Sequence, residues 1–138
     1  MEISIIIMTL NNRDVLRRAI EVLFAQAFPH DQYEIIVVAA YSTDGTAEMV
    51  QALDGPVPVR LVMQPGRGRA AARNLGARAA RGRILLYLDS DIWSDPGVIG
   101  RAPRALPARS PAGRRPGGAP VPSRHPRDAV HENQTDQP

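Results

Sequence analysis

The chain has 138 residues, enough for one ordinary domain, and 43% of them are hydrophobic, enough for a core. It contains no cysteine, which excludes disulfides and thiolate metal sites and fits the cytoplasm, where we expect the protein to lie, free or at a membrane surface. The early apolar run at residues 3–8 is far shorter than the roughly 20 residues of a membrane span and lacks a basic leader, so we expect neither a transmembrane segment nor a signal peptide.

The formal net charge of +3 is unevenly distributed along the chain. Residues 1–100 contain 10 arginines and 11 acidic residues, whereas residues 101–138 contain 7 arginines and 3 acidic residues. Eight of the 13 prolines also lie after residue 100, where no apolar periodicity persists. We therefore predict a folded domain over residues 1–99 and a disordered tail over residues 100–138. The dilute arginines of this tail, without interleaved aromatic residues, do not predict nucleic-acid binding.

Strands and helices are predicted to alternate in the first part of the chain. Apolar runs rich in β-branched residues predict strands, and apolar residues at helical spacing predict helices. In chain order the predictions are a strand at 3–8, a helix at 14–27 capped by Asn11 or Asn12, a strand at 33–38, a helix at 46–53, a strand at 59–63, a helix at 69–80 and a strand from 84. Arg60 indicates a less buried third strand, and Gly82 is predicted to terminate the third helix. This alternation predicts an α/β fold with a parallel, doubly wound sheet.

The fourth predicted strand ends in two acidic residues, Asp89 and Asp91. We expect a buried central strand whose carboxyl end, the ligand-binding end of a parallel sheet, carries both side chains. Because residues i and i+2 share a face of an extended backbone, the two carboxylates are predicted to converge. Oxygen ligands of this kind favour Mg²⁺ or Mn²⁺. The same short pattern also fits a solvated acidic turn.

Five segments form a recognisable series along the chain. They are Ile-Ile-Ile-Met-Thr-Leu-Asn-Asn-Arg from Ile5, Glu-Ile-Ile-Val-Val from Glu34, Ser-Thr-Asp-Gly-Thr from Ser42, Gly-Arg-Gly-Arg-Ala-Ala-Ala-Arg-Asn-Leu-Gly-Ala from Gly66 and Leu-Asp-Ser-Asp from Leu88. In this order and spacing they resemble the amino-terminal half of family 2 glycosyltransferases, over residues 2–98. The resemblance implies a GT-A fold whose Rossmann-like half binds a nucleotide-diphosphate sugar, and an Asp-x-Asp signature that contacts ribose and a metal.

The resemblance also implies particular site residues, by motif position. It places Thr9 and Asn11 at the nucleotide, and Arg69 and Arg73 beside the base and ribose. It assigns the Mg²⁺ or Mn²⁺ ion to the Asp-x-Asp pair, whose first acid, Asp89, also contacts the donor. Structural alternatives exist, because Thr9 and Asn11 also fit a turn and the two arginines fit a solvated helix face.

Two departures from the family pattern limit what the resemblance implies. The family usually has an acidic residue directly after the second strand that binds the base, where this chain has Ala39-Ala40-Tyr41. Base recognition is therefore weakened, or carried by another residue such as Asp44, which also fits a helix cap. The family's acceptor half is replaced by residues 100–138, so we assign neither an acceptor nor a catalytic base.

The expected function is transfer of a sugar from a nucleotide-diphosphate sugar to a glycan, lipid or small acceptor. One alternative is a dinucleotide-binding oxidoreductase, because Gly66-x-Gly68-x-x-Ala71 follows a predicted strand and opens a helix. Another is an inactive fragment or a non-catalytic nucleotide-binding module, since the change in composition near Gly100 fits a truncated or frameshifted gene. Half of a sheet also leaves an edge open, which predicts marginal stability or self-association.

Overall fold

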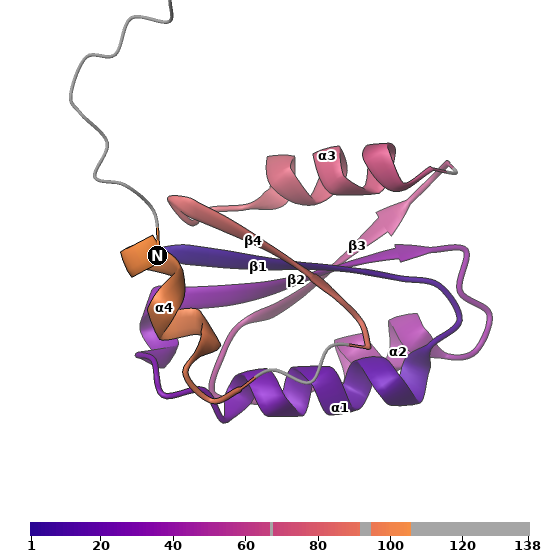
Figure 1. Cartoon of the computed structure of the whole chain (residues 1–138). Coiled ribbons are helices and arrows are strands. Elements are labelled where there is room, and N and C mark those ends of the chain that lie inside the picture. The colour runs from indigo at the N-terminus through magenta and orange to yellow at the C-terminus, as the bar shows by residue number, and fades with distance from the viewer. Residues whose placement is uncertain (67, 92–94, 106–138) are drawn as a thin grey trace, which may run out of the picture. The chain divides into compact units, whose positions relative to one another are not determined.

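The computed structural model of the chain describes residues 1–66, 68–91 and 95–105. These residues form a four-stranded parallel sheet with helices on both faces (Figure 1). The elements are β1 (Ile3–Thr9), α1 (Arg13–Phe24), a short 3-10 helix η1 (His30–Gln32), β2 (Tyr33–Ala40), α2 (Thr46–Gln51), β3 (Val59–Gln64), α3 (Arg69–Ala79), β4 (Ile84–Asp89) and α4 (Val98–Ala105). The predicted α/β class is confirmed, and the largest shift at an element end is that of α1, which stops at Phe24.

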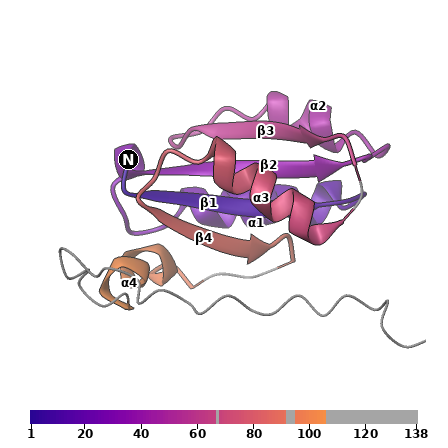
Figure 2. The same ribbon diagram turned by 90° about the horizontal axis from the view of Figure 1, so that it is seen from above.

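The strand order is β3-β2-β1-β4, and all neighbouring strands are parallel. The chain moves outward from β1 to β3 and then returns to place β4 on the other side of β1, as Figure 2 shows. The order of strands therefore reverses at β1, and Met8 near its carboxyl end lies opposite Asp89 of β4. Such a reversal opens a crevice at the carboxyl edge of a sheet, where ligands of open α/β folds bind.

In the described part of the chain, β4 is an edge strand, so the prediction of a buried central strand is wrong. Its residues are mostly half-buried, and Leu85 is exposed. The run is apolar because Leu86 and Leu88 pack on one face of the sheet and Tyr87 packs on the other. The opposite edge strand, β3, is also half-buried over most of its length, as Arg60 indicated. Self-association through either edge stays a prediction.

Alternate residues of the central strands supply two apolar layers. Ile3, Ile5 and Ile7 pack against α1 on one face of the sheet, and Ile6 packs against α3 on the other. A β-carbon at Gly76 of α3 would lie 2.5 Å from Cγ2 of Ile6. The absence of a side chain at this position therefore allows α3 to approach the sheet closely.

The chain forms a further helix, α4, where disorder from residue 100 was predicted. Ile99 is fully buried, and Val98 and Ala102 pack on the core shared with α1. The Asp95 carboxylate accepts hydrogen bonds from the backbone N–H of Gly97 (2.9 Å) and from the Arg101 guanidinium (2.8 Å), which stabilises the start of the helix. The predicted domain boundary thus falls within α4, and the predicted disorder of residues 106–138 lies outside the described residues.

The described helices are all short. None of the helices within residues 1–66, 68–91 and 95–105 is long and apolar enough to cross a bilayer. The longest of them, α1, has 12 residues, and it packs its apolar face on the sheet.

A buried polar cluster attaches the α3–β4 connection to the sheet. We call it the Glu34 cluster, made of Ser4, Glu34, Arg60 and Arg81. The fully buried Glu34 carboxylate accepts hydrogen bonds from the Ser4 hydroxyl (2.7 Å), the Arg81 backbone N–H (2.8 Å) and the Arg60 guanidinium (3.1 Å). Buried charge is tolerated when it is paired and hydrogen-bonded in this way. The cluster therefore holds the start of β4 beside β1 and β2.

Gly82 lies against β1 within the same connection. Its N–H donates to the Ser4 hydroxyl (2.8 Å), and a β-carbon on it would lie 2.5 Å from backbone atoms of Ile3 and Ser4. The predicted role of Gly82 as the terminator of α3 is wrong, because α3 ends at Ala79 and Gly82 is not among the glycines with positive φ. Close backbone approach is its physical role.

We expect the Glu34 cluster to make the protein less stable in acid. Burial alone would raise the pKa of Glu34, but the hydrogen bonds from Ser4 and Arg81 and the charge of Arg60 outweigh it, so the pKa in the folded state is lowered. A lowered pKa contributes stability that is fully present above the unfolded value of about 4.3 and is lost as the pH falls through the folded value. Glu34→Gln should therefore reduce the free energy of unfolding at pH 7 by about 2 kcal/mol and flatten its decline in acid.

Urea unfolding between pH 7 and pH 3 measures this effect. Glu48→Gln, which replaces an exposed acid on α2, is the matched control and should keep the wild-type profile. Parallel acid declines for Glu34→Gln and wild type would contradict the assignment.

Candidate functional site

Loops that are distant in sequence meet at the carboxyl edge of the sheet. The β1–α1 loop and the turn after β4 flank the reversal of strand order. The Asn12 side-chain amide donates a hydrogen bond to the Ser90 hydroxyl (3.2 Å), which joins these two segments directly. The carboxyl edge is therefore a connected surface, and it is where parallel sheets bind ligands.

Asn11 fastens the β1–α1 loop to the β2–α2 loop. Its side-chain oxygen accepts a hydrogen bond from the Thr43 N–H (2.8 Å), and its own N–H donates to the Ser42 hydroxyl (3.1 Å). Its φ of 47° lies in the left-handed region, which asparagine tolerates better than most residues. Asn11 is therefore a turn residue, which is the structural alternative that the sequence allowed. It lies exposed at the carboxyl edge.

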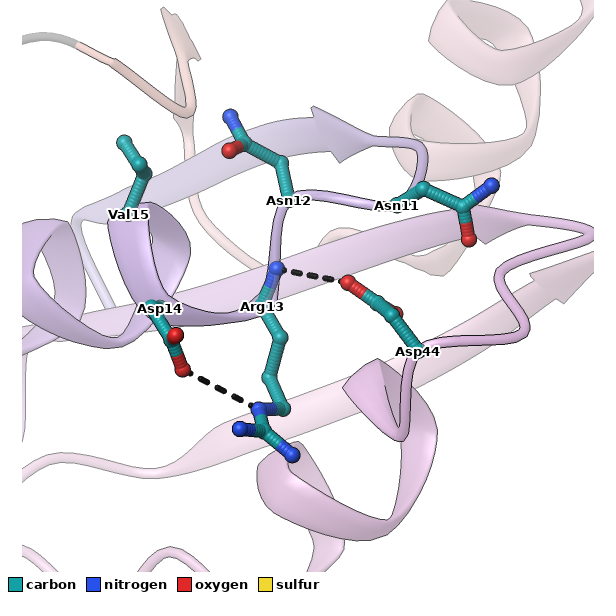
Figure 3. A pocket seen from close by; sticks show the side chains of 6 residues that line it. All are labelled: Asn11, Asn12, Arg13, Asp14, Val15 and Asp44. Carbon is teal, nitrogen blue, oxygen red and sulfur yellow. Dashed lines mark hydrogen bonds and ion pairs between the residues drawn. The ribbon is translucent and has the colours of Figure 1, made fainter.

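Asp44 caps two helices at once, and Figure 3 shows its bond to the start of α1. One carboxylate oxygen accepts from the backbone N–H of Arg13 (2.9 Å) at the start of α1, and the other accepts from the N–H of Thr46 (3.1 Å) and from its hydroxyl at the start of α2. The bond from the Thr46 hydroxyl is the main cause that lowers the pKa of Asp44, and the Arg13 N–H adds to it. The side chains predicted to cap α1 do not do so, since Asn12, its N-cap residue, makes no such bond.

Thr9 is the last residue of β1, the strand at which the strand order reverses. The residue is only 6% exposed, and its hydroxyl has no hydrogen-bond partner among the described residues. An unsatisfied buried hydroxyl costs about 1–3 kcal/mol, so native proteins rarely keep one without a reason. The accessible area of the Thr9 hydroxyl is below 1 Å², so a ligand at the carboxyl edge would reach it only after a neighbouring side chain moved.

Asp89 and Asp91 both lie exposed at the carboxyl end of β4. Asp89 is the last strand residue, whereas Ser90 and Asp91 form a turn, so the prediction that an extended backbone aligns the two acids is wrong. No group of three or more His, Cys, Asp or Glu side chains suited to a metal occurs within the described ranges. Two carboxylates nevertheless fit Mg²⁺ or Mn²⁺ when substrate phosphates and water supply the other ligands.

Arg69 and Arg73 lie on α3, on the face of the sheet opposite α1 (Figure 1). Arg69 opens the helix and is exposed near the carboxyl edge. The guanidinium of Arg73 lies 5.3 Å from the centre of the Tyr87 ring, and the Tyr87 hydroxyl donates to the Arg73 carbonyl (3.2 Å). The Arg73 side chain therefore packs on Tyr87 of β4, and the residue remains exposed.

A shallow hollow of about 350 Å³ opens at the start of α1 (Figure 3). It is lined by Asn11, Asn12, Arg13, Asp14, Val15 and Asp44. Arg13 pairs there with Asp14 at 3.1 Å, although both side chains remain largely exposed. The hollow includes the predicted site residues Asn11 and Asp44 but neither Asp89 nor Asp91. It therefore covers one side of the carboxyl edge.

Comparison with known proteins assigns the family. The model of the family described as Glycosyl transferase family 2 matches residues 4–109. The chain belongs to this family. It is 34% identical over 96 residues to an uncharacterized glycosyltransferase of Nostoc sp., an alignment that covers 67% of this chain and 29% of the relative. The chain thus spans less than a third of that relative's length.

Solved structures of known proteins have the same fold. Staphylococcus aureus TarS 1–349 in complex with UDP-GlcNAc superposes with a TM-score of 0.67 and 26% identity, covering 75% of this chain and 30% of that chain. The mannosyltransferase PcManGT from Pyrobaculum calidifontis, in complex with GDP-Man and Mn²⁺, superposes with a TM-score of 0.66 and 28% identity. This alignment covers 71% of this chain and 30% of that chain. The resemblance to family 2 and the Rossmann-like GT-A architecture are therefore confirmed, and nothing supports the oxidoreductase alternative.

Proposed function

We propose that the chain contains the donor-binding part of a metal-dependent glycosyltransferase, which transfers a sugar from a nucleotide-diphosphate sugar. The observation that carries this proposal is the reversal of strand order at β1, which places the exposed Asp89 at the carboxyl edge of the sheet, opposite Met8. The family match supports it, and so do the UDP-GlcNAc and the GDP-Man and Mn²⁺ bound to two similar structures.

Each residue of the carboxyl edge has a role in this proposal. Asp89 and Asp91 hold Mg²⁺ or Mn²⁺ and the diphosphate, with Asp89 also at the ribose, and Thr9 and Asn11 contact the nucleoside. When bound, the metal neutralises the charge that grows on the diphosphate leaving group. The hydrogen bond from Asn12 to Ser90 keeps the two flanking segments together before the donor arrives, which reduces the entropic cost of ordering them.

The arginines of α3 contribute unequally to the proposed site. Arg69 adds an exposed positive charge near the carboxyl edge, suited to a phosphate. Arg73 lies on the Tyr87 ring, so we propose that it orients β4 beside the base and ribose side of the donor. The role of Asp44 is to hold α1 and α2, since its oxygens are already engaged.

The acceptor side of the reaction is also part of the proposal. The acceptor is a glycan, a lipid or a small molecule, and activation of its hydroxyl needs a general base. His30, the one histidine in the described ranges, lies in η1 with its ring 6.1 Å from that of Tyr33 and is not at the carboxyl edge. We therefore propose that residues 1–99 bind the donor, and we assign no catalytic base among them.

Isothermal titration of the whole chain with UDP, GDP and their sugars tests this function. We expect Mn²⁺ to tighten binding at least about tenfold relative to EDTA, because a cation held by Asp89 and Asp91 would offset the charge of the diphosphate. Circular dichroism confirms that the titrated protein is folded. A folded chain that binds none of these nucleotides, or that binds NADH without metal, would overturn the proposal.

A further inference from the structure

Tyr41 is an exposed aromatic residue at the carboxyl end of β2. Its side chain is 54% exposed, and its φ of 42° lies in a region that bulky residues rarely adopt. Its hydroxyl donates to the carbonyl oxygen of Pro65, in the loop that leads into α3. The ring is thus held between two loops of the carboxyl edge in a conformation that is costly unless its surroundings maintain it.

The position of Tyr41 suits one part of a nucleotide. Neighbouring strands lie about 4.8 Å apart, so the carboxyl ends of β4 and β2 are separated by roughly 10 Å, with β1 between them. A nucleoside diphosphate that lies along this edge with its phosphates at Asp89 and Asp91 has its ribose above β1. Its base then lies at the end of β2, where Thr9 pairs with Ala39 and Tyr41 follows two residues later.

The hydrogen-bond acceptors near this position are already engaged within the protein. Both oxygens of Asp44 accept hydrogen bonds from the starts of α1 and α2. The Ser42 hydroxyl and the Asn11 side-chain oxygen accept bonds from backbone N–H groups. The methyl side chains before Tyr41 offer no hydrogen bond at all. Among the described residues, no free acceptor is left there to bind the N–H groups of a base, whereas the exposed Tyr41 ring offers a face, and every base has a π-face that can stack on it.

We propose that Tyr41 contacts the donor nucleobase through its ring, so that the site binds uracil and guanine nucleotides with similar affinity. This inference rests on the proposed donor-binding function. Stacking discriminates weakly between bases, in contrast to a carboxylate that hydrogen-bonds to one base edge. Tyr41 is thus a specificity-determining residue of the chain.

Titrations of the whole chain in Mn²⁺ with UDP, GDP and ribose 5-diphosphate test the proposal. The wild-type affinities for UDP and GDP should agree within about fivefold. Tyr41→Leu should weaken both by about tenfold, since stacking is lost, and leave the affinity for ribose 5-diphosphate unchanged. Tyr41→Phe, which removes the bond to Pro65 but keeps the ring, should retain both nucleotide affinities.

The outcomes separate this proposal from the proposed function. If Tyr41→Leu weakens the binding of ribose 5-diphosphate as much as the binding of UDP, the residue has a structural role and the proposal is wrong. A strong wild-type preference for one base that persists in Tyr41→Leu would also overturn it, while donor binding would stand. Absence of binding to all three probes by folded protein would overturn both.

Discussion

The Asp91→Asn variant should lose metal-dependent nucleotide binding. In the proposed site two carboxylates hold the cation, and substrate phosphates and water complete its ligands. An amide is neutral and a weaker ligand for a hard cation, so one remaining carboxylate cannot retain it. Because Asp91 acts through the metal, Asp91→Asn should weaken UDP binding in Mn²⁺ by the factor that removal of Mn²⁺ costs the wild type, about tenfold or more.

Titration with UDP in Mn²⁺ and in EDTA measures the effect. Binding in EDTA should be nearly equal for Asp91→Asn and wild type, because the metal is absent from both. Asp54→Asn, which replaces an exposed acid in the connection between α2 and β3, is the matched control and should bind like wild type. Wild-type affinity of Asp91→Asn in Mn²⁺ would remove Asp91 from the proposed site.

The Gly82→Ala variant should be the most destabilised single methyl addition in the fold. Its new β-carbon would lie 2.5 Å from the Ile3 carbonyl carbon and the Ser4 nitrogen, and neither is a flexible side chain that can move away. The backbone must shift, which also strains the hydrogen bond from Gly82 to Ser4. We expect a loss of about 3 kcal/mol in the free energy of unfolding, a large fraction of a typical domain's stability.

Gly66→Ala is the control for this variant. Its added β-carbon meets nothing within 4 Å, and Gly66 is not among the residues with positive φ. Its stability should change by no more than about 0.5 kcal/mol. Urea unfolding of the two variants and wild type gives the comparison. Equal stability of Gly82→Ala and Gly66→Ala would show that the α3–β4 connection is not packed as described.

Much of the fold could be predicted because local patterns and tertiary burial agree. The β-branched runs that form β1 and β2 are buried on both faces, and Leu16, Ile20 and Leu23 form the buried stripe of α1. The central position of β4 was predicted wrongly for a physical reason. A strand covered by helices on both faces is apolar whether it lies at the centre or at the edge of a sheet.

Long-range hydrogen bonds explain most of what the sequence could not show. Asp44 fits a cap for the helix that follows it, but its bond to Arg13, 31 residues earlier, depends on how two loops meet. The family motifs predicted Thr9 and Asn11 as site residues, whereas no motif predicted a role for the exposed ring of Tyr41. An aromatic residue directly after an apolar strand was the available signal. The extension of helix α4 past residue 100 was missed because its short apolar face contains Pro103 and adjoins a proline-rich tail.

The Glu34 cluster lies at the amino ends of the strands, far from the acids, yet it determines which way Asp89 faces. It anchors residues 81 and 82, and from there β4 pairs with β1 from Ile84 opposite Ile3 to Asp89 opposite Met8. Side chains alternate along a strand, so a deletion or insertion of one residue between this anchor and Asp89 would turn the carboxylate toward the opposite helix layer. The number of residues in β4, as much as their identity, is therefore under constraint.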